Sequence, residues 1–175
     1  TIHAEVKSLQ TVIEKILFLS SVTKQGVYAS FETVYLDELI HEVVGEKKAL
    51  AKQKDVMLSI RTCEPFTLSG NCALLKILLT NLLDNAIKYS DNSTTVIIAL
   101  VDEQVSIENK GVSIAEEEMP YIFDRFYRTD VSRNSSKGGS GIGLSIVKKI
   151  LELLVENGAR PAEPGDQGHQ YDVAP

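Results

Sequence analysis

The stretch from Lys137 to Ile150, KGGSGIGLSIVKKI, decides the fold of this chain. Glycines stand at every second position near its start, and an apolar pattern with helical spacing follows directly. The glycines are Gly139, Gly141 and Gly143, and the apolar positions are Leu144, Val147, Ile150, Leu151 and Leu154. We interpret the stretch as a glycine-rich loop that continues into a helix.

Such a junction offers backbone N–H groups without partners and the positive end of a helix dipole, and glycine lets the backbone approach a phosphate closely. The same pattern also fits an ordinary helix start, so phosphate binding and simple capping both stay open. A dinucleotide-binding loop would need its third glycine at Leu144, and a P-loop would need Lys-Ser or Lys-Thr after its last glycine. Spacing excludes both of these motifs.

The composition suits one compact domain with an appendage, because the 175 residues are 43% hydrophobic and 24% charged. No apolar run approaches membrane-spanning length and no signal peptide opens the chain, so we predict no membrane contact. A net charge of −6 argues against a nucleic-acid partner, since such surfaces neutralise phosphates with Lys and Arg. Cys63 and Cys72 lack neighbouring metal-ligand residues, and we expect reduced thiols in a cytoplasmic setting.

The amino-terminal segment shows a heptad pattern that predicts a helix. Its apolar residues are Ile2, Val6, Leu9, Ile13 and Ile16, and the stripe is widened by Val12, Leu17 and Leu19. A stripe this wide is typical of a bundle helix, which must pair with a missing helix, a second copy or the following domain. A loop over Lys24 to Ser30, with Gly26, predicts a domain boundary.

The remainder of the chain is predicted to mix strands and helices. Strands are expected at Phe31–Val34, Val56–Arg61, Phe66–Leu68, Thr94–Leu100 and Gln104–Asn109. One helix is expected from Leu36, and another from about Cys72 to Tyr89 with Asn71 as its N-cap. The last two strands are predicted to form a hairpin through Val101, Asp102 and Glu103.

The helix expected over residues 72–89 carries a second chemical signal. Asn81, Asn85 and Lys88 recur at steps of four and three, so two amides and an ammonium share a face. Asn is a mediocre helix former, which suggests a use for its side-chain oxygen. Amide oxygens suit Mg²⁺, which takes its remaining ligands from water and phosphates. A merely polar helix face is the alternative, and this helix alone does not decide.

A run of four aromatic residues, Tyr121, Phe123, Phe126 and Tyr127, is expected to lie in the core. The polar segment from Arg128 to Lys137 follows it, and with Arg133 it carries three cations. Because this segment directly precedes the glycine loop, we predict that it is a lid.

Taken together, these motifs resemble a known family. The order NLLDNAIKYS (81–90), a glycine loop after a strand, IFDRFYR (122–128) and GGSGIGLSIVKKI (138–150) is similar to the N, G1, F and G2 boxes of sensor histidine kinases, in the GHKL family of ATP-binding domains. The resemblance implies an α/β fold: a two-layer sandwich of a mixed sheet backed by helices, of the Bergerat type, preceded by one long bundle helix. Residues 1–25 would be the second helix of the dimerisation domain and residues 31–175 the catalytic ATP-binding domain, closed by PGDQGHQYDV (164–173) as a strand.

The resemblance also implies roles for individual residues. Asn85 would be the Mg²⁺ ligand, and the catalytic positions would be Asn81, Lys88 and Arg128. The remaining nucleotide-binding positions would be Tyr89, Asn109, Gly111, Ser113, Phe123, Lys137, Gly139, Gly141, Gly143 and Leu144.

The implied activity is transfer of the γ-phosphate of ATP, bound with Mg²⁺, to a histidine on an acceptor helix. None of His3, His41 and His169 has the family's acceptor motif, so that helix is expected in the same or a sister protomer but outside this sequence. The other implied partner is a response-regulator receiver domain. The full-length protein is expected to be a homodimer whose cytoplasmic portion includes this chain.

The G1 box departs from the family pattern Asp-x-Gly-x-Gly, because this chain has Asn109, Gly111 and Ser113 at the defined positions. A neutral amide in place of the carboxylate is expected to weaken the bond to adenine and to reduce binding by about tenfold. Ser113 would cost about 1 kcal/mol if its φ is positive. Two alternatives stay open: a GHKL ATPase that drives conformational change, and a degenerate domain that binds nucleotide weakly and acts as a dimerisation or partner-binding module.

Overall fold

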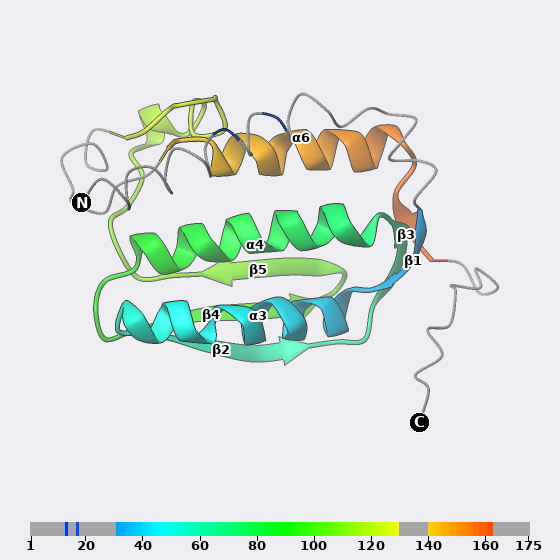
Figure 1. The fold of residues 1–175 in the computed structure, drawn as a ribbon, viewed down its shortest axis with the longest axis horizontal. Coiled ribbons are helices and arrows are strands. Elements are labelled where there is room, and N and C mark those ends of the chain that lie inside the picture. Colours follow the sequence, from blue (N-terminus) through cyan, green and yellow to red (C-terminus); the bar gives the residue numbers. More distant parts are fainter. Residues whose placement is uncertain (1–12, 14–16, 18–30, 130–139, 163–175) are drawn as a thin grey trace.

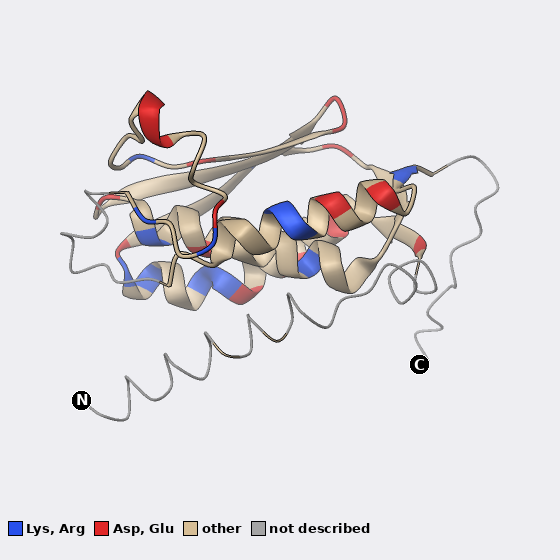
Figure 2. Ribbon diagram, turned by 90° about the horizontal axis from the view of Figure 1, so that it is seen from above, with Lys and Arg blue, Asp and Glu red and all other residues tan. Residues whose placement is uncertain are grey.

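The computed structural model describes residues 13, 17, 31–129 and 140–162, and it shows two layers. Three helices cover one face of a three-stranded sheet, as the two perpendicular views in Figures 1 and 2 show. The helices are α3 (Leu36–Gln53), α4 (Cys72–Tyr89) and α6 (Gly143–Glu156). The mixed sheet backed by helices that the sequence predicts is therefore confirmed.

The main sheet consists of β2 (Val56–Cys63), β4 (Thr94–Val101) and β5 (Gln104–Glu108), in the order β2-β4-β5. β2 runs parallel to β4, and β4 pairs with β5 as an antiparallel hairpin. Side chains alternate across the sheet, so that Val96, Ile98 and Leu100 are buried beneath the helices. In the hairpin turn, Asp102 and Glu103 both adopt positive φ, as a two-residue primed turn requires.

A second, smaller sheet lies at the end of the helices where α4 begins (Figure 1). It is antiparallel and contains β1 (Glu32–Tyr35), β3 (Thr67–Gly70) and β6 (Arg160–Pro161), in the order β1-β3-β6. β6 follows α6 directly, so this sheet ties the end of the third helix to the start of the domain (Figure 1).

α4 is the central helix, with α3 and α6 on either side (Figure 1). The side chain of Asn71 accepts a hydrogen bond from the backbone N–H of Leu74 at 2.9 Å, which confirms the predicted N-cap. The apolar residues at helical spacing, Leu75, Leu78, Leu79, Leu82 and Ala86, predict one buried stripe, but neighbours surround α4 and more of it is buried, while Leu82 is only half-buried. The buried residues of α4 are Leu74, Leu75, Leu78, Leu79, Asn81, Leu83, Ala86 and Ile87.

Ion pairs join α3 to α4 on the surface. The ammonium of Lys76 lies 2.6 Å from a carboxylate oxygen of Glu42 and 2.7 Å from one of Glu46. These hydrogen bonds raise the pKa of Lys76, which therefore stays charged. Lys47 pairs with Asp84 at 2.7 Å in the same interface. The pairs are exposed or half-exposed, so we assign them a role in the register of the two helices and little net stability.

Two sequence expectations about burial are wrong. Tyr121, Phe123 and Phe126 are exposed to 52%, 38% and 60%, and Tyr127 is half-buried, so the aromatic run is not core. The run follows the 3₁₀ turn η1 (Glu116–Glu118), and no described helix or strand packs over these side chains. Leu151 of α6, one of the apolar positions in the predicted helical pattern, is 47% exposed. The buried side of that helix contains Leu153 and not Leu151.

Other expectations lie outside the described residues. These are the closing strand over 164–173 and most of the amino-terminal helix. Ile13 and Leu17 of that segment are helical, with 47% and 62% of their surfaces exposed. The proposed domain boundaries stay predictions.

Candidate functional site

The first element of the candidate site is the buried amide of Asn81 on α4. Its Nδ2 donates a hydrogen bond of 2.8 Å to the carbonyl of Ile77, one turn earlier, and the residue is 8% exposed. This bond leaves Oδ1 as the free acceptor. A Cβ added to Gly143 would lie 3.4 Å from that Oδ1, so the amide oxygen faces the start of α6. The sequence predicted a polar face here, but α6 covers it at Asn81.

Asn85 lies one turn further along the same face of α4. Its side chain is half-buried and makes no hydrogen bond to any residue that the structure describes. An amide in this position keeps its oxygen available for a ligand.

Lys88 and Tyr89 form a pair at the carboxyl end of α4. The ammonium of Lys88 donates to the hydroxyl of Tyr89 at 3.1 Å and lies 4.6 Å from the centre of its ring. Such a cation–π contact holds the positive charge at the end of the helix, where the dipole also favours it.

The loop after β5 is attached to this end of α4. Ser90 and Gly111 form an antiparallel bridge, and the N–H of Asp91 donates to the carbonyl of Lys110 at 2.8 Å. A Cβ on Gly111 would overlap the carbonyl oxygen of Tyr89. Glycine is therefore required by close backbone approach, and the structure brings the predicted G1 and N boxes together.

Asn109 and Ser113 flank that glycine on the surface. Both side chains are exposed, and the Nδ2 of Asn109 lies 3.4 Å from the position that a Gly111 Cβ would take. Ser113 is not among the residues with positive φ, so the backbone strain considered for it does not arise.

The backbone at Gly141 packs against the end of the aromatic segment. The N–H of Phe126 donates to the carbonyl of Gly141 at 2.9 Å, and both residues have left-handed φ values, of 66° and 67°. A Cβ on Gly141 would lie 2.7 Å from the carbonyl oxygen of Tyr127. The predicted F and G2 boxes are thus in direct contact.

The amino terminus of α6 follows at once. Ile142 stands at its N-cap and has no polar side-chain atom, in contrast to Asn71 on α4. Ser145 donates its hydroxyl to the carbonyl of Ile142 at 2.8 Å. Among the described residues, the first N–H groups of α6, including that of the half-buried Leu144, therefore have no side-chain cap and can serve an anion.

The structure brings together Asn81, Asn85, Lys88, Tyr89, Gly111, Gly141 and Gly143 around the carboxyl half of α4. α6 begins, and the loop after β5 rises, at this same end of α4 (Figure 1). Arg128 is half-buried, and Phe123 is exposed. Lys137, Gly139 and Arg133 lie outside the described residues.

Sequence reasoning missed the backbone role of Phe126 and Tyr127. Their main-chain atoms, and not their rings, meet Gly141. No pattern of residue types signals a left-handed phenylalanine, so this contact could not have been found from the sequence.

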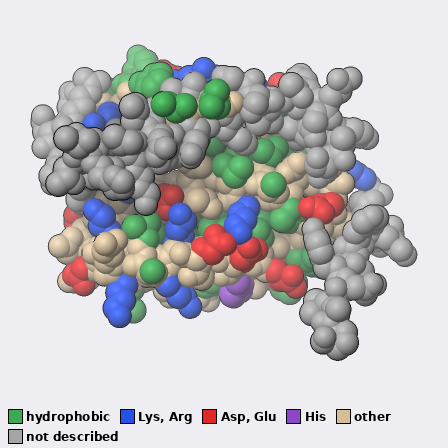
Figure 3. Space-filling model, viewed as in Figure 1, with side chains coloured by type: hydrophobic (Ala, Val, Ile, Leu, Met, Phe, Trp, Pro, Cys, Tyr) green, Lys and Arg blue, Asp and Glu red, His purple; other side chains and the backbone are tan. Residues whose placement is uncertain are grey.

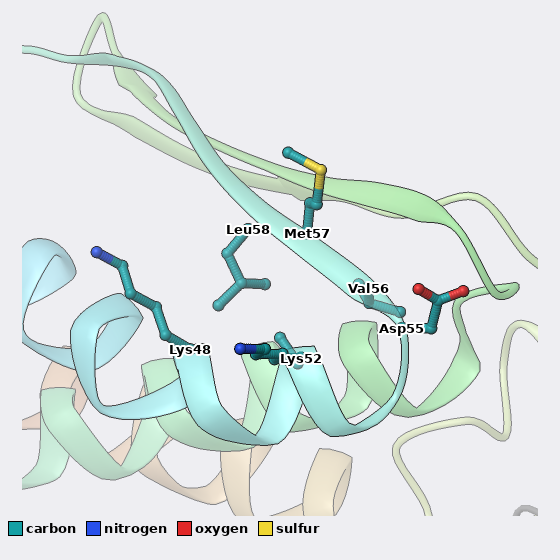
Figure 4. Close-up of a pocket in the computed structure, with 7 residues that line it drawn as sticks. Lys48, Lys52, Asp55, Val56, Met57 and Leu58 are labelled. Atoms are coloured by element: carbon teal, nitrogen blue, oxygen red, sulfur yellow. The ribbon is translucent and has the colours of Figure 1, made fainter.

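Exposed apolar side chains gather on the segment over this site, at the top of Figure 3. They belong to Val112, Ile114, Met119, Tyr121, Phe123 and Phe126. A pocket of about 310 Å³ lies elsewhere, between α3 and β2 (Figure 4). That pocket shares no residue with the site around α4.

Within the described part of the chain, no three or more His, Cys, Asp or Glu side chains are grouped to hold a metal ion. A metal at this site would therefore take amide, phosphate and water oxygens. None of the described helices is both long and apolar enough to cross a membrane. Of the three histidines, His41 is the one described, and its Nδ1 lies 2.8 Å from the carbonyl of Asp37 on the same helix.

Comparison with known proteins agrees with this geometry. Residues 70–169 match the family described as histidine kinase-, DNA gyrase B- and HSP90-like ATPase. The chain is 34% identical over 151 residues to the sensor histidine kinase CusS of Escherichia coli K12, covering 84% of this chain and 31% of CusS. It is 33% identical over 153 residues to the sensor histidine kinase YkoH of Bacillus subtilis, covering 86% of this chain and 33% of YkoH.

Solved structures show the same fold. A mycobacterial sensor histidine kinase, MprB, superposes with a TM-score of 0.60 at 27% identity, over 70% of this chain and 78% of that one. The catalytic domain of the histidine kinase ThkA superposes with a TM-score of 0.60 at 28% identity, over 70% and 80% of the two chains. The chain spans about a third of the length of the curated relatives that it matches.

Proposed function

The chain belongs to the family of histidine kinase-, DNA gyrase B- and HSP90-like ATPases, and on that premise we propose that it is the ATP-binding catalytic part of a sensor histidine kinase. Its reaction would transfer the γ-phosphate of ATP to a histidine of an acceptor helix, giving ADP and phosphohistidine. The named kinase relatives favour this function over a degenerate, weakly binding domain and over an ATPase of another type.

One observation carries the proposal: four sequence-distant motifs meet at the carboxyl half of α4. Gly143 faces the amide oxygen of Asn81, Gly111 packs on the carbonyl of Tyr89, and the Phe126 backbone bonds to Gly141. A Cβ would overlap backbone atoms at Gly111 and Gly141, so glycine is required at both, and neither contact serves the hydrophobic core. Together they form a cradle of backbone N–H groups and amide oxygens that suits a nucleoside triphosphate.

The residues also fit Mg²⁺. Asn85 has an amide without a hydrogen bond among described residues, and the oxygen of Asn81 points to the glycine turn. Asn85 would be the metal ligand, with Asn81 close to the same ion. Bound there, Mg²⁺ would neutralise charge on the phosphate oxygens during transfer.

The remaining residues would bind and orient the substrates. The N–H groups from Gly141 to Leu144 would donate hydrogen bonds to the phosphate oxygens. Lys88 would hold positive charge beside the phosphates, and Tyr89 would flank the nucleotide. Asn109 and Ser113 would face the base, with Phe123 at the edge of the site. Gly139 would lie beneath the phosphates with Gly141 and Gly143, and Lys137 and Arg128 would close over them. Catalysis in this scheme is positioning and charge neutralisation, without covalent chemistry by the protein.

The partners follow from the same proposal. They are an acceptor helix in the same or a sister protomer, and the receiver domain of a response regulator that takes the phosphoryl group onward. The complete protein would be a homodimer with this part in the cytoplasm.

The test is a titration of the chain with Mg-ATP, using Asn85→Ala as the control, followed by addition of an acceptor-helix protein. Binding that Asn85→Ala abolishes, together with an acid-labile phosphohistidine on the acceptor, supports the kinase function. Binding with ATP hydrolysis and no phosphohistidine would indicate a different ATPase. Failure to bind Mg-ATP at millimolar concentration would show a degenerate domain.

A further inference from the structure

We propose that the groove between α3 and the open edge of β2 is a docking site for an extended acidic peptide segment of a partner protein. The segment would pair its backbone with β2 and place acidic side chains beside Lys48 and Lys52. This site is separate from the nucleotide site, because α3 and β2 lie on the opposite side of α4 from α6 (Figure 1).

The groove is an open depression on the surface with an apolar floor. Its volume is about 310 Å³, and its walls are the last turns of α3 and the first residues of β2 (Figure 4). Ala51 and Val56 form buried parts of the floor, at 1% and 5% exposure, and Leu58 is half-buried beside them. Met57 is 68% exposed, and its side chain points away from α3 in Figure 4, so it lies on the other face of β2 and not on the floor of the groove.

The backbone of β2 is available for pairing. β2 is an edge strand, and in the described part of the chain it pairs with β4 alone. Alternate residues of such a strand direct their N–H and C=O groups away from the sheet, so an added strand can bond to them. β2 has eight residues, which is long for an unpaired edge. A groove between a helix and an edge strand is the geometry used to bind peptides by strand addition.

The charges of the groove select an acidic ligand. Lys48 and Lys52 are one helical turn apart and exposed, and neither forms an ion pair with a described residue. The adjacent Lys47, by contrast, is paired with Asp84 at 2.7 Å. Two cations that pair with no described residue are notable beside a groove in a chain of net charge −6, although Asp55 lines its far end. They would attract carboxylates and leave basic peptides unbound.

The opposite end of the groove fixes the orientation of the ligand. Asp55 lies there, at the far end from Lys48 in Figure 4. Its carboxylate accepts a hydrogen bond of 2.6 Å from the hydroxyl of Ser93, and its carbonyl accepts one of 2.7 Å from the Ser93 N–H. This fixed negative charge repels an acidic residue, so the acidic part of the peptide belongs at the lysine end.

The experiment uses the whole chain, isotopically labelled, and a short end-blocked peptide of alternating glutamate and valine. We expect amide signals of β2 and of the last turns of α3 to shift, with no change in Mg-ATP binding. Lys52→Glu should weaken peptide binding about fivefold or more, because an exposed attraction becomes a repulsion. Lys148→Glu makes the same charge change at an exposed position of α6 and should change affinity less than about twofold. A proline at the centre of the peptide should abolish binding, since it removes the donor needed for strand pairing.

Three results would overturn the proposal. The first is equal binding of a lysine–valine peptide, which would remove the charge argument. The second is that the peptide binds elsewhere, shown by shifted signals outside β2 and α3, or that it does not bind at all. Absence of binding would indicate that the lysines protect the strand edge against pairing. The third is a change in the β2 signals with protein concentration alone, which would show that a second copy of the chain occupies the edge.

Discussion

The backbone N–H of Phe126 donates a hydrogen bond of 2.9 Å to the carbonyl oxygen of Gly141, and both residues are left-handed. This bond joins the chain before residues 130–139 to the chain after them. A left-handed conformation costs a residue with a side chain about 1–2 kcal/mol, so the contact must be stabilised by its surroundings. The junction holds the glycine turn in place beside α4.

Gly141→Ala is therefore expected to damage the site. The alanine Cβ would lie 2.7 Å from the carbonyl carbon of Phe126 and from the carbonyl oxygen of Tyr127. Both are backbone atoms, so the main chain would have to shift to relieve the overlap. We expect Mg-ATP affinity to fall more than about tenfold. Gly158→Ala is the matched control, because its φ is +82° with nothing within 4 Å. It should lower the free energy of unfolding by about 1 kcal/mol and leave affinity unchanged. Equal affinities for the two variants would refute the role of the junction.

Gly111→Ala tests the attachment of the loop after β5 to α4. Its Cβ would overlap the carbonyl oxygen of Tyr89, so the Ser90–Gly111 bridge must open. We expect both the thermal midpoint and nucleotide affinity to fall. Gly45→Ala, in α3, has nothing within 4 Å of the new Cβ. That control should raise the free energy of unfolding by up to about 1 kcal/mol, because alanine is the better helix former. Calorimetry of both variants distinguishes the steric overlap at residue 111 from the general effect of replacing glycine by alanine.

Asn85→Ala should separate binding from stability. Its amide makes no hydrogen bond to the described residues, so its removal should change the free energy of unfolding by less than about 0.5 kcal/mol. Mg-ATP binding should fall strongly, and binding of ATP without Mg²⁺ should change little. Asn81→Ala is the contrast, since it loses the buried bond to Ile77 and should also lower stability by about 1 kcal/mol. A magnesium dependence that survives in Asn85→Ala would remove this residue from the metal site.

Local patterns predicted most of the fold. The Asn71 cap, the helix over 72–89 and the hairpin before Gln104 each depend on neighbours in sequence, and the structure has them where expected. Burial of Tyr121 and Phe126 depended on whether another layer covers their segment, and local sequence does not encode that. The site divides in the same way. Helical spacing aligned Asn81 with Asn85, but only the packing of α6 on α4 shows that Asn81 is buried against Gly143.

The pH dependence of thiol reactivity offers a test of the α3 contacts. Burial raises the pKa of Cys63, and the carboxylate of Asp37 raises it further. Because the pKa of this thiol is higher in the folded state than in the unfolded state, its ionisation destabilises the folded state. The stability from the neutral thiol is complete below the unfolded pKa and is lost as pH rises through the folded pKa. We expect alkylation of Cys63 to require a higher pH than free cysteine. Asp37→Asn should lower the midpoint for Cys63 and leave that of Cys72 unchanged, because the pKa of Cys72 is set by burial and by Glu32, Glu42 and Lys76. Cys63 is measured in Cys72→Ser, and Cys72 is measured in Cys63→Ser.

Asn109→Asp tests the proposed base contact. Asn109 is exposed beside Gly111, on the side of the loop that follows β5, and its neutral amide offers both a donor and an acceptor. A carboxylate would accept a stronger hydrogen bond from the exocyclic amine of adenine, about 1.5–3 kcal/mol against about 0.5–1.5 for the amide. We therefore expect the variant to bind ATP about tenfold more tightly.

An amide can also turn its donor toward the carbonyl of guanine, so the unmodified chain should tolerate GTP better than the variant does. Competition between the two nucleotides measures this directly. Gln53→Glu makes the same change from amide to carboxylate at an exposed position of α3, away from the site, and serves as the control that should leave the ratio unaltered. Equal exclusion of GTP by the chain and by Asn109→Asp would show that residue 109 does not read the base.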